Sequence, residues 1–200
     1  TDFSLRFRFF QKRGLSQFTS GTESSYNRER SVRIRFRVAE DITSQIDVLN
    51  KQNNIYTENS TRSRQITSNG FISDWTYRLM KNVDMGFVLE TSRAEDFFQK
   101  SPPFADFNSQ SIRAIFSFQR VGQLRTEISR EEVQVKNAPL NYALLFELTN
   151  GKSVGKTYLW NLSFDYRISQ NLQAMVQYNG RVEQERKAIH TLRAEVRAFF

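Results

Sequence analysis

The chain has 200 residues, enough for one domain, and contains no cysteine and one histidine. These counts exclude a disulfide framework, cysteine-based metal or redox sites and any histidine cluster for a metal, and we expect no cofactor. With a mean hydropathy of −0.59, no segment approaches the ~20 apolar residues of a membrane-spanning helix. The net charge is +8, but the arginines alternate singly with apolar residues instead of clustering, so we expect no nucleic-acid partner.

Ten segments alternate apolar and polar residues with a period of two. In the first, Phe3, Leu5 and Phe7 alternate with polar residues such as Arg6. A helix would spread such a pattern around its whole circumference, so each segment is predicted to be a strand with one apolar face. The ten segments are 3–10, 32–38, 42–48, 71–79, 83–89, 112–118, 124–128, 158–168, 172–178 and 190–200.

Short and long connections alternate between these segments. Tight links at 39–41, 81–82, 120–122 and 169–170 predict periplasmic turns, and polar stretches predict long external loops near residues 12–28, 51–62, 94–109 and 135–155. The fold class predicted is all-β: an antiparallel transmembrane β-barrel of about ten strands, or the C-terminal ten strands of a larger barrel, as a single domain over 1–200. Segment 141–149 also alternates. We place it in the external loop, as loop or as strand extending above the membrane, because counting it as spanning would make the strand number odd.

The charged residues occupy the parity opposite to the apolar residues. A lone charge facing lipid at mid-depth costs about 2–4 kcal/mol, so these side chains are expected to face the lumen. Two interpretations are open: the arginines form the ion-paired interior of a filled barrel, or an anion-attracting wall of a pore. The number of strands decides between these two interpretations. Side chains fill the interior of a barrel of about eight strands, whereas a barrel of ~16 strands encloses an aqueous channel. The predicted basic wall of the lumen consists of Arg6, Arg8, Arg33, Arg35, Arg37, Arg193 and Arg197.

Three motifs that could carry chemistry are weak. Segment 151–157 resembles a phosphate-binding loop, but it has three residues between its glycines instead of four and precedes a predicted strand instead of a helix. His190 has no convincing partner serine in the sequence. Glu95, Asp96 and Asp106 share one predicted loop, but their spacing selects no reaction, and a solvated loop face is the interpretation favoured. We therefore predict that the chain is not an enzyme.

The end of the chain carries a family resemblance. The last strand, with its alternating apolar face and terminal Phe, resembles the closing strand of bacterial outer-membrane β-barrels, where the assembly machinery reads it; Leu192, Val196 and Phe200 are the residues that would form this signal. Together with segments 148–155, 160–168 and 171–174, it resembles the C-terminal end of large, mostly uncharacterised outer-membrane proteins of the Bacteroidota–Chlorobiota lineage. This resemblance implies location and architecture, transfers no catalytic residue, and leads us to expect a fragment that lacks its N-terminal part.

The expected function is a structural, partner-binding or transport module in the outer membrane of a Gram-negative bacterium. The alternatives are an outer-membrane enzyme acting on lipid or peptide at the external rim, and a soluble all-β binding protein. The expected partners are outer-membrane lipid, the barrel assembly machinery and other membrane or surface protein chains. The residues predicted to bind a partner lie in two long loops and are Phe97, Phe98, Phe104, Phe107 and Tyr142.

Overall fold

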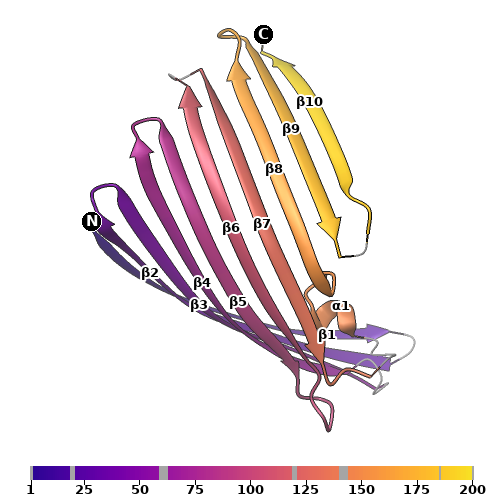
Figure 1. The fold of residues 1–200 in the computed structure, drawn as a ribbon. Coiled ribbons are helices and arrows are strands. Elements are labelled where there is room, and N and C mark those ends of the chain that lie inside the picture. The colour runs from indigo at the N-terminus through magenta and orange to yellow at the C-terminus, as the bar shows by residue number, and fades with distance from the viewer. Residues whose placement is uncertain are drawn as a thin grey trace.

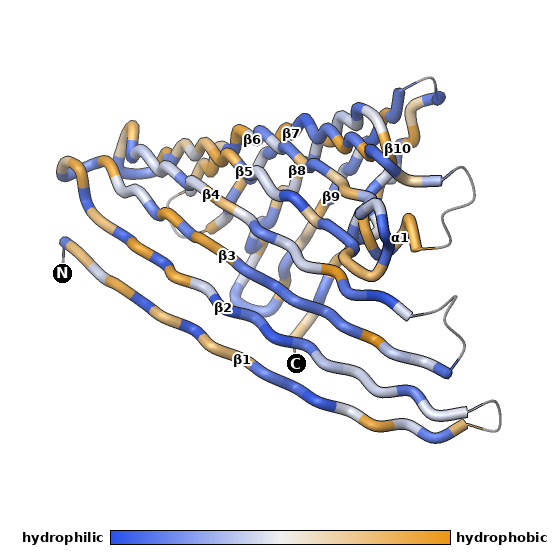
Figure 2. The backbone as a smooth tube through the Cα atoms, turned by 90° about the horizontal axis from the view of Figure 1, so that it is seen from below, coloured by the Kyte–Doolittle hydropathy of each residue, from blue (hydrophilic) through white to orange (hydrophobic). Residues whose placement is uncertain are grey.

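The computed structural model describes residues 2–18, 21–58, 63–118, 121–139, 144–184 and 186–199. Each strand pairs antiparallel with its neighbours in the sequence, so that one ten-stranded sheet runs from β1 to β10 in chain order. The sheet curves into a trough (Figures 1 and 2). The elements are β1 (Phe3–Phe18), β2 (Gly21–Ala39), β3 (Ile42–Thr57), β4 (Arg64–Met80), β5 (Val83–Asp96), β6 (Phe104–Phe118), β7 (Gly122–Lys136), α1 (Leu145–Leu148), β8 (Gly155–Arg167), β9 (Leu172–Glu183) and β10 (Ile189–Ala198).

The strand order confirms the predicted fold class. Each of the ten alternating segments falls on one strand, and the short links fall at the turns between β2 and β3, β4 and β5, β6 and β7, and β8 and β9. Within the described residues β1 pairs only with β2 and β10 only with β9, so the sheet is open. No helix in the described part of the chain is long and apolar enough to cross a membrane.

Both termini lie at the same end of the sheet as the short turns (Figure 1). Backbone hydrogen bonds hold them there: the Arg37 amide donates to the Asp2 carbonyl, and the Phe199 amide donates to the Asn171 carbonyl at 2.9 Å. We call this the turn end, and the opposite end, near α1, the loop end.

Residues paired across neighbouring strands share a face, and successive residues along a strand alternate between faces. The outward face is apolar from the turn end to about mid-sheet: Phe7, Val32, Val48 and Phe71 form one continuous row of it. A stretch of nine residues, such as 71–79 of β4 or 158–166 of β8, would cover about 20–25 Å of membrane at usual strand rise and tilt. This zone, the apolar belt, has the height of the lipid-facing band of membrane barrels.

The strands continue far beyond the apolar belt, and this corrects the predicted loops. The ranges 12–28 and 51–62 are largely strand, because β1 and β2 are connected only across residues 19–20, and β3 continues to Thr57. The range 94–109 shrinks to 97–103, and 135–155 to 137–154. The apolar-polar alternation ends there because the outward side chains turn polar, while the backbone of β3 stays paired with β4. On the outward face the side-chain amide of Asn50 donates from Nδ2 to Asn69 Oδ1 at 2.7 Å.

The polarity of the two faces reverses above the apolar belt. The concave face carries Ile66, Ala105, Phe107 and Val133, all buried, at the height where the outward face is polar. Helix α1 lies on this side of the trough (Figure 2) and covers these residues with Leu148, which is 1% exposed. These buried apolar side chains therefore form a cluster inside the trough, near its loop end.

Segment 141–149 differs from the extended strand that we considered for it. Residues 140–143, including Tyr142, lie outside the described residues, and Leu145–Leu148 form a helical turn. Leu144 and Leu148 stand four positions apart and are both buried, whereas Phe146 between them is 72% exposed. A period of two and a spacing of i to i+4 coincide over so short a run, so the sequence pattern could not distinguish them.

Candidate functional site

Contacts to three strands, β4, β6 and β7, hold the segment from α1 to β8 against the concave face. Glu147 pairs with Arg64 of β4 at 3.3 Å. Lys152 pairs with Glu131 of β7 at 3.1 Å, and its Nζ lies 3.3 Å from the ring centroid of Phe107 on β6. These contacts were not predicted, because nothing in the local sequence shows which strand a loop residue reaches. A pocket of about 250 Å³ remains between α1 and strands β2 to β7. It is lined by apolar side chains such as Leu49, Ile66 and Ile72 and by charged ones such as Lys51 and Glu90.

A chain of polar hollows follows the concave face beside α1. The hollow nearest the loop end has a volume of about 650 Å³ and is lined by Glu127, Asn161 and Arg181. The next, of about 290 Å³, shares Glu127 and Asn161 with it. A third, of about 380 Å³ near the turn end, shares Arg113 with the second. We call these three hollows the polar path: neighbouring hollows share lining residues, and together they extend from the loop end toward the turn end.

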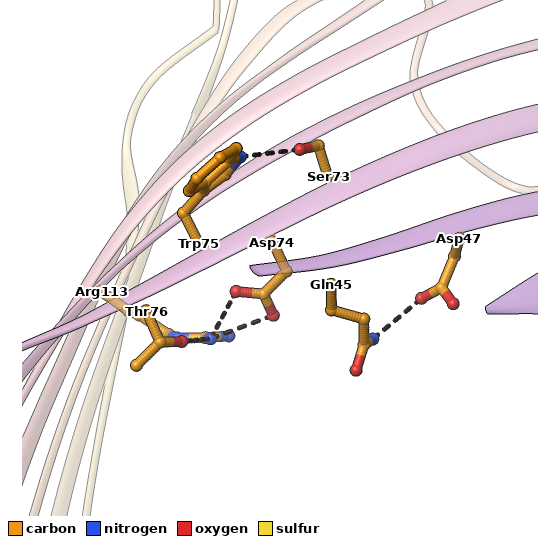
Figure 3. A network of polar contacts seen from close by, with 7 residues as sticks. All are labelled: Gln45, Asp47, Ser73, Asp74, Trp75, Thr76 and Arg113. Atoms are coloured by element: carbon orange, nitrogen blue, oxygen red, sulfur yellow. Dashed lines mark hydrogen bonds and ion pairs between the residues drawn. The ribbon is translucent and has the colours of Figure 1, made fainter. Parts of the chain in front are cut away.

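Arg113 stands where the second and third hollows meet. Its guanidinium crosses β5 and donates from Nη2 to both carboxylate oxygens of Asp74 on β4, at 2.7 and 3.0 Å, and to Thr76 Oγ1 at 3.0 Å. The crossing requires Gly86 on β5, because a Cβ there would lie 2.4 Å from Arg113 Nε. Figure 3 shows both faces of β4: Asp74 and Thr76 meet Arg113 on one side, and Trp75 donates to Ser73 on the other.

The predicted basic wall is only partly ion-paired. On the concave face, Arg6 of β1 is the register partner of Arg33 of β2. Arg33 is in turn the register partner of Asp47 of β3 and forms an ion pair of 2.6 Å with it. Arg37 pairs with Asp2, and Arg193 and Arg197 both pair with Glu195. Within the described residues, no ion pair involves Arg6, Arg8 or Arg35. The wall is thus concentrated on β1 and β2, while Arg193 and Arg197 lie on β10, at the other edge of the open sheet.

The predicted partner-binding residues do not share one surface. Phe97 and Phe98 are exposed in the short loop after β5. Phe104 and Phe107 lie in strand β6, not in a loop, because β6 begins earlier than the alternation indicated. Phe104 carries Arg93 over its ring on the outward face, and Phe107 is 7% exposed beneath Lys152 on the concave face. A role in partner binding stays a prediction.

The predicted assembly signal stays a prediction as well. Leu192 and Val196 are both exposed on β10. They stand four positions apart on one strand, so they share its outward face. Phe200 lies outside the described residues.

The residues weighed for catalysis occupy structural positions. His190 on β10 stacks on Tyr178, whose hydroxyl lies 2.8 Å from His190 Nδ1, and its ring lies 5.6 Å from Trp160. Asp96 is fully buried, not solvated as expected, and accepts hydrogen bonds from the backbone amides of Gln65 and Phe98. Asp106 pairs with Arg93 at 2.6 Å.

On the outward face beyond the apolar belt, hydrogen bonds and nearby charges shift the pKa values of Glu132 and Arg93. The Gln134 amide donates to Glu132 at 3.0 Å and, together with Lys156 and Arg130, lowers the pKa of this carboxyl. The hydrogen bonds to Asp106 raise the pKa of the Arg93 guanidinium. The outward surface of β5 to β8 thus carries charges of both signs that compensate each other.

Solved outer-membrane proteins share this fold. OmpTdeltaL8, a loop L8 deletion mutant of OmpT from Vibrio cholerae, matches with a TM-score of 0.64 at 8% identity over 94% of this chain and 62% of that one. Outer-membrane expressed OmpT of Vibrio cholerae matches with a TM-score of 0.62 at 7% identity, over 95% and 64%. The CymD monoaromatic hydrocarbon channel matches with a TM-score of 0.53 at 10% identity, over 100% and 71%.

The class of protein that this fold defines is the outer-membrane β-barrel. The likeness supports the predicted location in the bacterial outer membrane. The chain spans less than two thirds of the length of the OmpT structures. No family model matches the sequence, and no curated protein matches it.

Proposed function

We propose that this chain forms the wall of a transport pore in the outer membrane, and that the segment from α1 to β8 narrows the pore. The polar path carries this proposal: hollows that share charged and amide side chains follow the concave face of a sheet whose outward face bears the apolar belt. One structure of this fold is a monoaromatic hydrocarbon channel, which supports a transport role. The apolar side chains that line the pocket beneath α1 offer a small apolar solute a place to bind on its way.

The charge distribution favours anions on one side of the pore. Arg6, Arg8 and Arg35 face the concave side without a carboxylate partner among the described residues, whereas Glu127 and Glu131 line the opposite wall. This arrangement produces a field across the trough that orients a charged or dipolar solute. Two narrower predictions from the sequence are carried forward as proposals: membership of a larger barrel, and descent from the Bacteroidota–Chlorobiota type. An enzyme activity at the external rim stays the alternative prediction.

Cysteine labelling of the full chain tests the proposal, because the natural sequence has no cysteine. Asn161 lines two hollows of the polar path, and its neighbour Leu162 is on the outward face, in the register row of Thr126 and Tyr178. We expect the folded protein to conduct ions in a planar bilayer, and a charged thiol reagent to reduce the conductance of Asn161→Cys but not of Leu162→Cys. Absence of conductance from the folded protein, or equal block of both variants, overturns the proposal.

A further inference from the structure

We infer that the outward face of β1 to β3, just beyond the apolar belt, binds the phosphate group of an anionic membrane lipid. Three arginines, Arg13, Arg28 and Arg30, lie on this face, and we call them the outward arginine patch. Arg30 sits opposite Phe9 of β1, the last aromatic of the belt in this strand, with its guanidinium 5.8 Å from the ring centroid. Arg13 lies over the ring of Tyr26 at 5.4 Å.

The position of the patch matches the position of lipid phosphates. A guanidinium stacked on the uppermost aromatic of the apolar belt stands where acyl chains give way to headgroups. Arg28 is one register step beyond Arg30 on the same face and donates from Nη2 to Gln52 at 2.8 Å. Its Nε is buried and has no hydrogen-bond partner among the described residues. This buried atom cannot reach a lipid, so the N–H donors that the patch offers at headgroup height are chiefly those of Arg13 and Arg30, which are exposed.

The patch is also unneutralised, in contrast to Arg93 and Arg130 elsewhere on the outward face, which pair with Asp106 and Glu132. Within the described residues no ion pair involves Arg13, Arg28 or Arg30. In the same register row as Arg30, three strands further on, Arg93 donates two hydrogen bonds to the carboxylate of Asp106. The same row thus contains one compensated arginine and one free arginine. Guanidinium groups bind phosphate by paired N–H donors, and the adjacent amides of Asn50 and Gln52 can add further hydrogen bonds.

The occupant to which we commit is a lipid phosphate, because the patch adjoins the apolar belt. A free phosphate ion gains only the charge interaction, whereas a lipid also packs its acyl chains on Phe7, Phe9 and Val32. The inference does not depend on pore activity, because the patch lies on the face opposite to the polar path.

Lipid retention tests this inference. The folded full chain is placed in phosphatidylcholine nanodiscs doped with phosphatidic acid or with the carboxylate cholesteryl hemisuccinate, and the doped lipid that co-purifies is counted by native mass spectrometry. We expect enrichment of phosphatidic acid but not of the carboxylate, and a loss of about fivefold in affinity for each arginine replaced by glutamine in Arg13→Gln, Arg28→Gln and Arg30→Gln. Added inorganic phosphate should not displace the lipid.

The matched control is Arg93→Gln, in the same register row, which should retain phosphatidic acid like the natural protein. If the triple glutamine variant fails to fold, the corresponding triple lysine variant keeps the charge and tests the paired donors, with a partial loss expected. Equal retention of both doped lipids, displacement by inorganic phosphate, or an equal loss in Arg93→Gln overturns the inference.

Discussion

Arg113 reaches Asp74 across an intervening strand only because residue 86 has no side chain. A Cβ on Gly86 would lie 2.4 Å from Arg113 Nε and 2.7 Å from its Cγ, so the middle of the arginine side chain occupies the space that any other residue would fill. The ion pair between β6 and β4 depends on this one position, and so does the placement of the Arg113 side chain, which lines two hollows of the polar path.

Replacing Gly86 with alanine should displace Arg113 and break its contacts with Asp74 and Thr76. We expect the free energy of unfolding to fall by about 1–3 kcal/mol, the usual cost of overpacking. Urea unfolding in lipid vesicles measures this change. Gly70→Ala is the matched control, because a Cβ there makes only ordinary contacts, 3.5 Å from Ser92 Cβ. If both variants lose equal stability, the loss does not come from a clash with Arg113. The same conclusion follows if Gly86→Ala lowers the free energy of unfolding just as much in an Arg113→Gln background.

The sequence predicted the membrane-spanning part of this fold well, for a physical reason. Within the belt, one face of the sheet contacts lipid and the other contacts water or charged groups, so apolar and polar side chains alternate along each strand. Residues Tyr158 to Tyr166 of β8 keep this alternation throughout. Beyond the belt both faces contact water or protein, so the contrast vanishes. Asn50 and Gln52 outside and Lys51 and Asn53 inside are all polar, yet they continue the ladder of β3. The strands there could be recognised only from the backbone pairing of the structure.

The candidate site was less predictable than the strands. The parity of the arginines placed the basic wall on the concave face, but the contacts of Glu147 and Lys152 join residues 83 and 21 positions apart. No local pattern encodes such distances. The one sequence signal for the α1 anchor was the pair Leu144 and Leu148, which matches a helical turn as well as a strand.

Leu148→Ala should release the α1 segment from the concave face. Truncating a fully buried leucine to alanine lowers stability by about 2–5 kcal/mol. Because Leu148 holds only this segment, we expect the loss to lower the free energy of local opening of the segment. Trypsin cleavage after Lys152 should therefore accelerate by at least about tenfold. Leu145→Ala removes the same atoms from a side chain that is 38% exposed and should leave the cleavage rate nearly unchanged. Equal acceleration in both variants would show that α1 is not held by Leu148.

The position of the Trp160 indole over Gly180, on the outward face, can be tested by fluorescence quenching from the lipid. A Cβ on Gly180 would lie 1.9 Å from Trp160 Cε2, so Gly180→Ala should push the indole away from the sheet and from His190. In a Trp75→Phe background, Trp160 is the only tryptophan, and quenching of its fluorescence by brominated lipid should increase. The same background with Gly70→Ala should show no change. An unchanged quenching in Gly180→Ala would mean that the indole does not lie over the glycine.

The two unpaired arginine sets should separate pore selectivity from lipid binding. Arg6, Arg8 and Arg35 share the concave face, whereas Arg13, Arg28 and Arg30 share the outward face, and each set carries three positive charges. Replacing the concave set with glutamine should shift the reversal potential toward cations in a salt gradient and leave retention of phosphatidic acid intact. Replacing the outward set with glutamine should reduce retention of phosphatidic acid and leave the reversal potential unchanged, because the sheet separates these charges from the lumen. Since both triple variants change the net charge equally, a general charge effect would move both readouts in both variants, and that result would contradict the assignment of the faces.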